Sequence, residues 1–217
     1  MNYCAIITAG GTSSRYGQKN KLLEKINGKE VIKYSAGILL NHPKIKQVII
    51  CANKSIINTL ENIFDKNEKL KIIEGGSTRQ ESVFKGLQEV SCDYVLIHDG
   101  ARPVINKELI DKIIETLPTQ KAITVATKTT DTIKVVHDGC VVKTLNRDEL
   151  YNIQTPQAFE TKLIKLAHEK YHGQSFSDDA GMIETLGQNV FILENDYKNI
   201  KITTKNDLDI AKIYLKI

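Results

Sequence analysis

A group of small and basic residues follows the first apolar segment of the chain. Tyr3–Thr8 has the pattern of a short buried strand, and six small residues come next: Ala9, Gly10, Gly11, Thr12, Ser13 and Ser14. Two cations lie behind them, Arg15 and Lys21. Small residues let backbone N–H groups approach oxyanions closely, and basic side chains neutralise the remaining charge. The segment predicts a phosphate-binding turn, although a plain strand-to-helix turn uses the same residue types.

A second glycine-containing turn follows the apolar segment Leu70–Glu74. Its sequence is G-G-S-T-R-Q-E-S-V, in which Thr78 and Glu81 have the spacing of a helix capping box. The glycines allow a ligand to approach the backbone closely. We expect a helix start here, whose backbone at Gly76 and side chain of Ser82 could also recognise a nucleotide base.

An acidic and a basic side chain follow the apolar segment Tyr94–Ile97, in the sequence H-D-G-A-R-P. A carboxylate at a strand end, such as Asp99, is a natural ligand for Mg²⁺ or for a hydroxyl group. Arg102 could bind a phosphate in bidentate fashion. The alternative is a structural ion pair between Asp99 and Arg102.

One segment predicts a β-hairpin. Residues 132–136 and 140–144 are strand-like, and they flank an Asp138-Gly139 turn. A hairpin interrupts the order of a parallel sheet, so we expect it to project as an arm and to pair with a second subunit. The alternative is a hairpin that folds back onto its own domain.

The rest of the chain alternates between strand and helix patterns. Six strands are predicted, at Tyr3–Thr8, Gln47–Cys51, Leu70–Glu74, Tyr94–Ile97, Ala122–Ala126 and Val190–Leu193. Seven helices are predicted, near Glu30–Leu40, Ser55–Phe64, Arg79–Val90, Lys107–Leu117, Glu160–Tyr171, Ser177–Leu186 and Lys205–Leu215. This order indicates a single α/β domain with a mostly parallel twisted sheet and helices on both faces. The strand-like segment 199–203 would bring Lys201 to the ligand edge of that sheet.

Composition limits the class of protein. No apolar run has the length of a membrane span, and the N-terminus lacks the pattern of a signal peptide, so we expect a cytoplasmic protein. The net charge of +4 and the absence of Trp argue against nucleic-acid binding. The four cysteines, Cys4, Cys51, Cys92 and Cys140, are far apart, which indicates neither a zinc site nor a disulfide framework. Since the sequence ends at Ile217, we expect no second enzyme behind this domain.

Seven ordered motifs together resemble one family. They are A-G-G-x-S-x-R, G-S-T-R-Q-E-S-V, H-D-G-A-R-P, D-T-I-K, T-P-Q-A-F, S-D-D-A and N-I-K-I-T-T, and they extend from Ala9 to about Ala211. The set resembles the 2-C-methyl-D-erythritol 4-phosphate cytidylyltransferases of the non-mevalonate isoprenoid pathway. The chain departs from the family pattern at Gly10, Ser13 and Gly100, without loss of a charged group.

The resemblance implies a fold and a reaction. The fold would be a Rossmann-like nucleotidyltransferase over residues 1–217, with a dimerisation β-arm at about 132–155. The reaction would join CTP and methylerythritol 4-phosphate, with release of pyrophosphate and with Mg²⁺ as the cofactor. A phosphate is already an anionic nucleophile, so catalysis would consist of positioning and charge neutralisation.

The resemblance also assigns roles to residues. Arg15 and Lys21 would stabilise charge on the α-phosphate and the pyrophosphate, residues 9–14 would hold the triphosphate, and Gly76 and Ser82 would recognise cytosine. Asp99 would hold the substrate or Mg²⁺. The remaining expected substrate contacts are Arg102, Thr132 and Lys201, together with Arg147 and Thr155 from the arm of the partner subunit.

Two other functions remain open at this point. A ribitol 5-phosphate cytidylyltransferase has a similar fold, but H-D-G-A-R-P and S-D-D-A favour methylerythritol phosphate over ribitol phosphate. A nucleotide-binding regulator without turnover is disfavoured because Arg15, Lys21 and Lys201 are all present.

Overall fold

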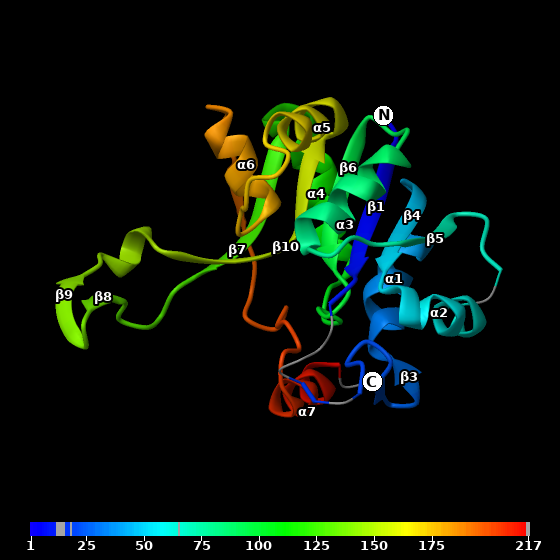
Figure 1. Cartoon of the computed structure of the whole chain (residues 1–217), viewed down its shortest axis with the longest axis horizontal. Helices are drawn as coiled ribbons and strands as arrows, with labels where there is room; N and C mark the ends of the chain where they lie inside the picture. Colours follow the sequence, from blue (N-terminus) through cyan, green and yellow to red (C-terminus); the bar gives the residue numbers. More distant parts are fainter. Residues whose placement is uncertain (12–15, 18, 65, 216–217) are drawn as a thin grey trace.

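A seven-stranded sheet forms the centre of the computed structural model (Figure 1), which describes residues 1–11, 16–17, 19–64 and 66–215. The strand order is β11-β7-β10-β6-β1-β4-β5. The strands are β1 (Tyr3–Ala9), β4 (Ile45–Ala52), β5 (Leu70–Glu74), β6 (Tyr94–Asp99), β7 (Ala122–Lys128), β10 (Tyr151–Glu160) and β11 (Phe191–Glu194). β10 runs antiparallel to both of its neighbours, and the other pairs are parallel. The predicted mostly parallel α/β sheet is confirmed.

Alternating side chains of β1 show why both faces of the sheet are covered. Ala5 and Ile7 belong to one buried cluster, while Cys4 and Ile6 belong to the other. Successive side chains of a strand point to opposite faces, so a strand with apolar residues on both faces needs cover on both sides. The first cluster includes residues of α1 (Val31–Asn41), α2 (Ile57–Ile63), α4 (Lys107–Gln120) and α7 (Lys205–Tyr214). The second includes residues of α3 (Arg79–Gln88), α5 (Thr161–Lys170) and α6 (Asp179–Thr185).

Two short hairpins lie outside the main sheet. β2 (Lys25–Ile26) pairs with β3 (Lys29–Glu30), and β8 (Lys134–His137) pairs with β9 (Cys140–Thr144). The turn of the second hairpin has φ of 47° at Asp138 and 77° at Gly139, as a two-residue turn of this class requires. Figure 1 shows this hairpin projecting away from the body of the molecule. The predicted hairpin and its turn are confirmed.

Two features of the strands differ from the sequence-based expectations. The strand β10 was not predicted, because its segment Tyr151–Glu160 carries Pro156 and three polar amides rather than an apolar alternation. Its register with β7 shifts between Ile153 and Gln157, an irregularity that accommodates proline. Residues 199–203 are not a strand; the Ile202 N–H donates to the carbonyl of Ala101, so the segment still reaches the sheet edge.

The cysteine prediction was wrong at one pair. Cys4 and Cys92 form a disulfide across 88 residues, from β1 to the segment before β6. Sequence spacing gave no signal for it, because strand pairing alone brings these positions together.

In the described part of the chain, no helix has the length and hydropathy needed to cross a membrane.

Candidate active site

Backbone and charged side chains meet at the carboxyl ends of β1, β5 and β6, where they line a cavity of about 350 Å³. The predicted residues Gly10, Gly11, Gly76 and Ser82 line this cavity, together with Ala9, Lys21, Asp99 and Lys201. Parallel strands bring turns from distant parts of the sequence to one edge of the sheet, which explains why they converge. Thr12, Ser13, Ser14 and Arg15 lie outside the described residues.

The Asp99 carboxylate at the end of β6 is surrounded by cations. Its Oδ2 lies 2.8 Å from Lys201 Nζ and 3.6 Å from Arg102 Nε, and its Oδ1 accepts from Arg79 Nε at 3.2 Å. Burial alone would raise the pKa of Asp99, but attraction by Arg79, Lys201 and Arg102 outweighs it and holds the pKa well below its ordinary value. Asp99 is therefore ionised at neutral pH, and the cluster keeps excess positive charge for an anionic ligand.

Arg102 is fixed in place by backbone carbonyls. Its Nη1 donates to the carbonyl of Asn199 at 2.7 Å, and its Nη2 to that of Ile153 at 3.4 Å. Its buried Nε has no hydrogen-bond partner among the residues that the structure describes. Burial lowers the pKa of Arg102, a group that nonetheless remains charged at neutral pH. The guanidinium is thus a fixed positive charge, whose buried Nε faces Asp99 Oδ2 at 3.6 Å.

Ser82 organises the turn between β5 and α3. Its Oγ accepts from the Gly76 N–H at 2.9 Å and donates to the Thr78 carbonyl at 2.9 Å. A Cβ at Gly75 would come within 2.8 Å of Ser82 Oγ, so this position needs glycine. The predicted cap is present, with the Glu81 N–H donating to Thr78 Oγ1. Ser82 shapes the cavity wall, and direct recognition of a base by its hydroxyl stays a prediction.

Thr155 lies beside Asp99 of its own chain, so its predicted delivery from a partner's arm was wrong. Thr155 belongs to β10, is 6% exposed, and its Oγ1 accepts from the Asp99 N–H at 3.0 Å. The same hydroxyl lies 3.0 Å from His98 Nδ1, while His98 Nε2 lies 3.0 Å from the carbonyl of Arg102. The arrangement requires Nε2 to carry the proton, so both ring nitrogens are engaged. Burial lowers the pKa of His98 to about 4, which keeps the ring neutral at pH 7.

We expect Thr155→Val to lower the free energy of unfolding by about 1–3 kcal/mol, because it leaves the buried Asp99 N–H and His98 Nδ1 without a partner. Urea unfolding at pH 7 measures the difference. Thr161→Val is the matched control, since the buried Thr161 Oγ1 has no hydrogen-bond partner within the described chain. An equal loss in both variants would contradict the role given to the Thr155 hydroxyl.

Thr132 and Arg147 are not brought to Asp99. Both lie exposed in the segment that leads to and from the projecting hairpin, and Arg147 Nη1 donates to the carbonyl of Thr130 at 3.3 Å. Neither lines the two cavities that contain Asp99. Within one chain these two residues therefore cannot act at the site that Asp99 marks.

Arg79, Asp179 and His98 were missed as contributors to the site. Arg79 connects Asp99 to Asp179, and the two ends of the Arg79–Asp179 contact are 100 residues apart in sequence. Arg79 is part of a quoted motif, yet nothing in the local sequence shows which carboxylates it meets. The S-D-D-A motif was the only available signal for Asp179.

The fit of a metal ion rests on a single carboxylate. No cluster of three or more His, Cys, Asp or Glu side chains suited to a metal occurs in the ranges that the structure describes. Mg²⁺ in nucleotide sites is commonly held by one or two carboxylates and by substrate phosphates. Asp99 is the carboxylate that lines the cavity, and a Mg²⁺ ion carried by a nucleotide would have to take the place of Lys201 at its Oδ2.

Comparison with known proteins agrees with the motifs. The family model of IspD, 2-C-methyl-D-erythritol 4-phosphate cytidylyltransferase, matches residues 3–217. A protein of that name from Caldanaerobacter subterraneus subsp. tengcongensis is 40% identical, over 100% of both chains. One from Clostridium tetani is also 40% identical, over 98% of this chain and 90% of that protein.

Solved structures give the same result. The 4-diphosphocytidyl-2C-methyl-D-erythritol synthase of Anaerococcus prevotii superposes with a TM-score of 0.87 at 34% identity, covering 100% of this chain and 99% of that one. The IspD of Francisella tularensis superposes with a TM-score of 0.86 at 28% identity, over 99% of this chain and 100% of that one. The full-length match to the family model and the 40% identity to curated relatives show that this chain belongs to the 2-C-methyl-D-erythritol 4-phosphate cytidylyltransferase (IspD) family.

Proposed function

We propose that this chain transfers CMP from CTP to 2-C-methyl-D-erythritol 4-phosphate, giving 4-diphosphocytidyl-2-C-methyl-D-erythritol and pyrophosphate. The observation that carries the proposal is the cation cluster around Asp99 at the carboxyl ends of β1 and β6, in a chain of this family. Two carboxylates, Asp99 and Asp179, stand against three cations there: Arg79, Arg102 and Lys201. The remaining positive charge suits two phosphorylated substrates.

The reaction needs charge stabilisation rather than proton removal. A phosphate oxygen of the acceptor attacks the α-phosphorus of CTP, the new P–O bond forms, and the bond to the pyrophosphate breaks. Lys21 and Arg15 stabilise the charge on the α-phosphate and on the leaving group, while the turn of residues 9–14 holds the triphosphate. His98 does not serve as a base, because it is fully buried and both ring nitrogens are engaged.

Two neighbouring cavities give each substrate a place. CTP occupies the cavity lined by the two glycine-containing turns. A second cavity of about 610 Å³ shares Arg79, Asp99 and Lys201 with the first, and Arg102, Gln154 and Ser177 also line it. Its cations suit the phosphate of the acceptor and its polar side chains suit hydroxyl groups. The shared Asp99 and Lys201 then lie where the two substrates meet.

Mg²⁺ and a second subunit complete the proposal. Asp99 would hold a Mg²⁺ ion bound to the triphosphate, which would neutralise phosphate charge.

The hairpin exposes the side chains of four valines, Val135, Val136, Val141 and Val142, whose exposed fractions lie between 44% and 65%. An apolar arm of this kind is a common dimer contact, and we infer that it carries Arg147 to the site of a partner subunit. On this proposal residues 1–217 form one domain that acts in the cytoplasm.

We expect pyrophosphate release to require CTP, methylerythritol 4-phosphate and Mg²⁺ together. The assay compares this acceptor with ribitol 5-phosphate, and CTP with UTP and ATP, at equal protein concentration. Similar kcat/KM values for UTP would contradict cytosine recognition at Gly76 and Ser82. Full activity in excess chelator would contradict the requirement for Mg²⁺. Faster turnover of ribitol 5-phosphate would favour the alternative acceptor. Binding of CTP without turnover would favour a regulator.

A further inference from the structure

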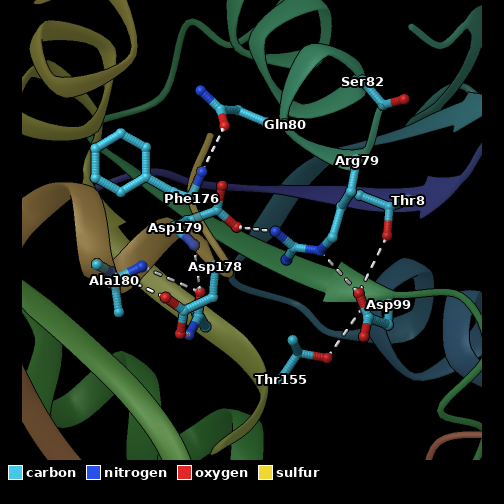
Figure 2. Close-up of polar contacts among 12 residues, drawn as sticks. Thr8, Arg79, Gln80, Ser82, Asp99, Thr155, Phe176, Asp178, Asp179 and Ala180 are labelled. Atoms are coloured by element: carbon cyan, nitrogen blue, oxygen red, sulfur yellow. Dashed lines mark hydrogen bonds and ion pairs between the residues drawn. The ribbon is translucent and has the colours of Figure 1, made fainter. Parts of the chain in front are cut away.

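Arg79 joins two carboxylates from different parts of the chain. Its Nε donates to Asp99 Oδ1 at 3.2 Å, and its Nη1 donates to Asp179 Oδ2 at 2.7 Å. Figure 2 shows the guanidinium between them, at the start of α3, with Asp99 at the end of β6 and Asp179 at the start of α6. One side chain thus connects the substrate edge of the sheet to a helix behind it.

Asp179 is an anchor that substrate cannot reach. It is fully buried, and in the described part of the chain it lines neither cavity that contains Asp99. Its Oδ1 lies 3.3 Å from His168 Nε2, and its N–H donates to Gln157 Oε1 at 3.0 Å. Gln157 also donates to Asp178, which caps α6 through the Gly181 N–H. These contacts hold the Asp179 carboxylate in one position, from which it orients Arg79.

The two oxygens of Asp99 have different partners. Oδ1 accepts from Arg79 and from Thr8 Oγ1, both at 3.2 Å. Oδ2 faces the two cations that also line the proposed acceptor cavity, Lys201 at 2.8 Å and Arg102 at 3.6 Å. A carboxylate held at Oδ1 cannot rotate about its Cβ–Cγ bond without breaking these contacts, so Oδ2 keeps a fixed direction.

We propose that Arg79, anchored by Asp179, is a positioning residue that fixes the Asp99 carboxylate and, through it, the Lys201 and Arg102 cations that receive the acceptor phosphate. This role rests on the proposed function, since it concerns the acceptor side of the same site. Arginine suits it because its planar fork contacts two carboxylates at once, which the single ammonium of lysine does not reproduce.

The first test separates the two substrates kinetically. Arg79→Ala is expected to lower kcat/KM for methylerythritol 4-phosphate about 10²-fold, as misplacement of a substrate-orienting group does. Arg79 also lines the CTP cavity, but its Nε and Nη1 are engaged by Asp99 and Asp179, so the KM for CTP should change less than about threefold. Arg79→Lys should recover part of the loss, and millimolar guanidinium should partly restore Arg79→Ala. A rise mainly in the KM for CTP would make Arg79 a nucleotide contact and overturn the proposal.

The second test is a double-mutant cycle with the anchor. Asp179→Asn should lower kcat/KM for the acceptor about 10-fold, although Asp179 lies outside the cavity. In the Arg79→Ala background the same substitution should add nothing, because both changes break one connection. The control is Tyr171→Phe, which removes the 2.8 Å hydrogen bond from Tyr171 to the Thr185 carbonyl at the other end of α6. It should lower stability and leave kcat/KM unchanged.

The outcomes distinguish this inference from the function on which it rests. Additive effects of Arg79→Ala and Asp179→Asn would refute the role of Asp179 as an anchor. An activity loss in Tyr171→Phe equal to that in Asp179→Asn would show that both losses come from lower stability. If the wild type turns over both substrates and Arg79→Ala has the same kcat/KM for the acceptor, the positioning role alone is refuted. An inactive wild type would refute the proposed function and the positioning role with it.

Discussion

Lys21→Ala is expected to reduce kcat about 10²–10³-fold while the free energy of unfolding changes little. Lys21 lines the proposed CTP cavity beside Gly10, Gly11 and Asp99. Its charge has most effect when negative charge moves onto the leaving pyrophosphate, and loss of one such contact typically costs about 2.7–4 kcal/mol of transition-state stabilisation. Arg15→Ala should have a similar effect on kcat, a prediction that rests on the sequence alone.

Steady-state kinetics and urea unfolding of the same samples test this prediction. Lys25→Ala is the matched control, because Lys25 is a nearby lysine that pairs with Glu30 at 3.4 Å and lies outside the cavity. The control should retain wild-type kcat. Near-normal turnover of Lys21→Ala, combined with a lower free energy of unfolding, would show that Lys21 supports the fold rather than the chemistry.

Local sequence was sufficient to predict those structural features that depend on residues close together in the chain. The apolar segment of β1 predicted a strand that ends before Gly10 and Gly11, which line the cavity at the carboxyl edge, and the Asp138-Gly139 pair predicted the turn of a hairpin. The position of Asp99 at a strand end also followed from a short apolar run and the residue after it. In each case the pattern and its structural consequence lie within ten residues of each other.

Sequence reasoning failed where the tertiary arrangement selects the partner. The family resemblance assigned Thr155 to the arm of a partner subunit, but β10 inserts between β6 and β7 and buries it next to Asp99. The contact from Arg79 to Asp179 spans 100 residues, and it exists only because α3 and α6 pack on the same face of the sheet. Neither placement has a local pattern that a single sequence could reveal.

Subunits that are inactive for different reasons are expected to complement one another if the arm acts across a dimer. Arg147 lies on the segment after β9 and lines neither cavity of its own chain that contains Asp99. Lys21 lines the CTP cavity of its own chain. In a symmetric dimer with exchanged arms, one Arg147→Ala subunit and one Lys21→Ala subunit form one site with both residues intact and one with neither. About half of the sites in each mixed dimer should therefore regain activity.

The control for this exchange uses two residues from one cavity. Mixed dimers of Lys21→Ala and Asp99→Asn should stay inactive, because Lys21 and Asp99 line the same cavity of one chain and each site then carries one defect. The experiment co-expresses the subunits with different tags, purifies the mixed dimer and measures pyrophosphate release. Recovery in both pairs would point to reversion or subunit contamination. No recovery with Arg147→Ala, in dimers verified by both tags, would mean that Arg147 takes no part in a partner's site. The exposed valines of the hairpin would then serve assembly alone.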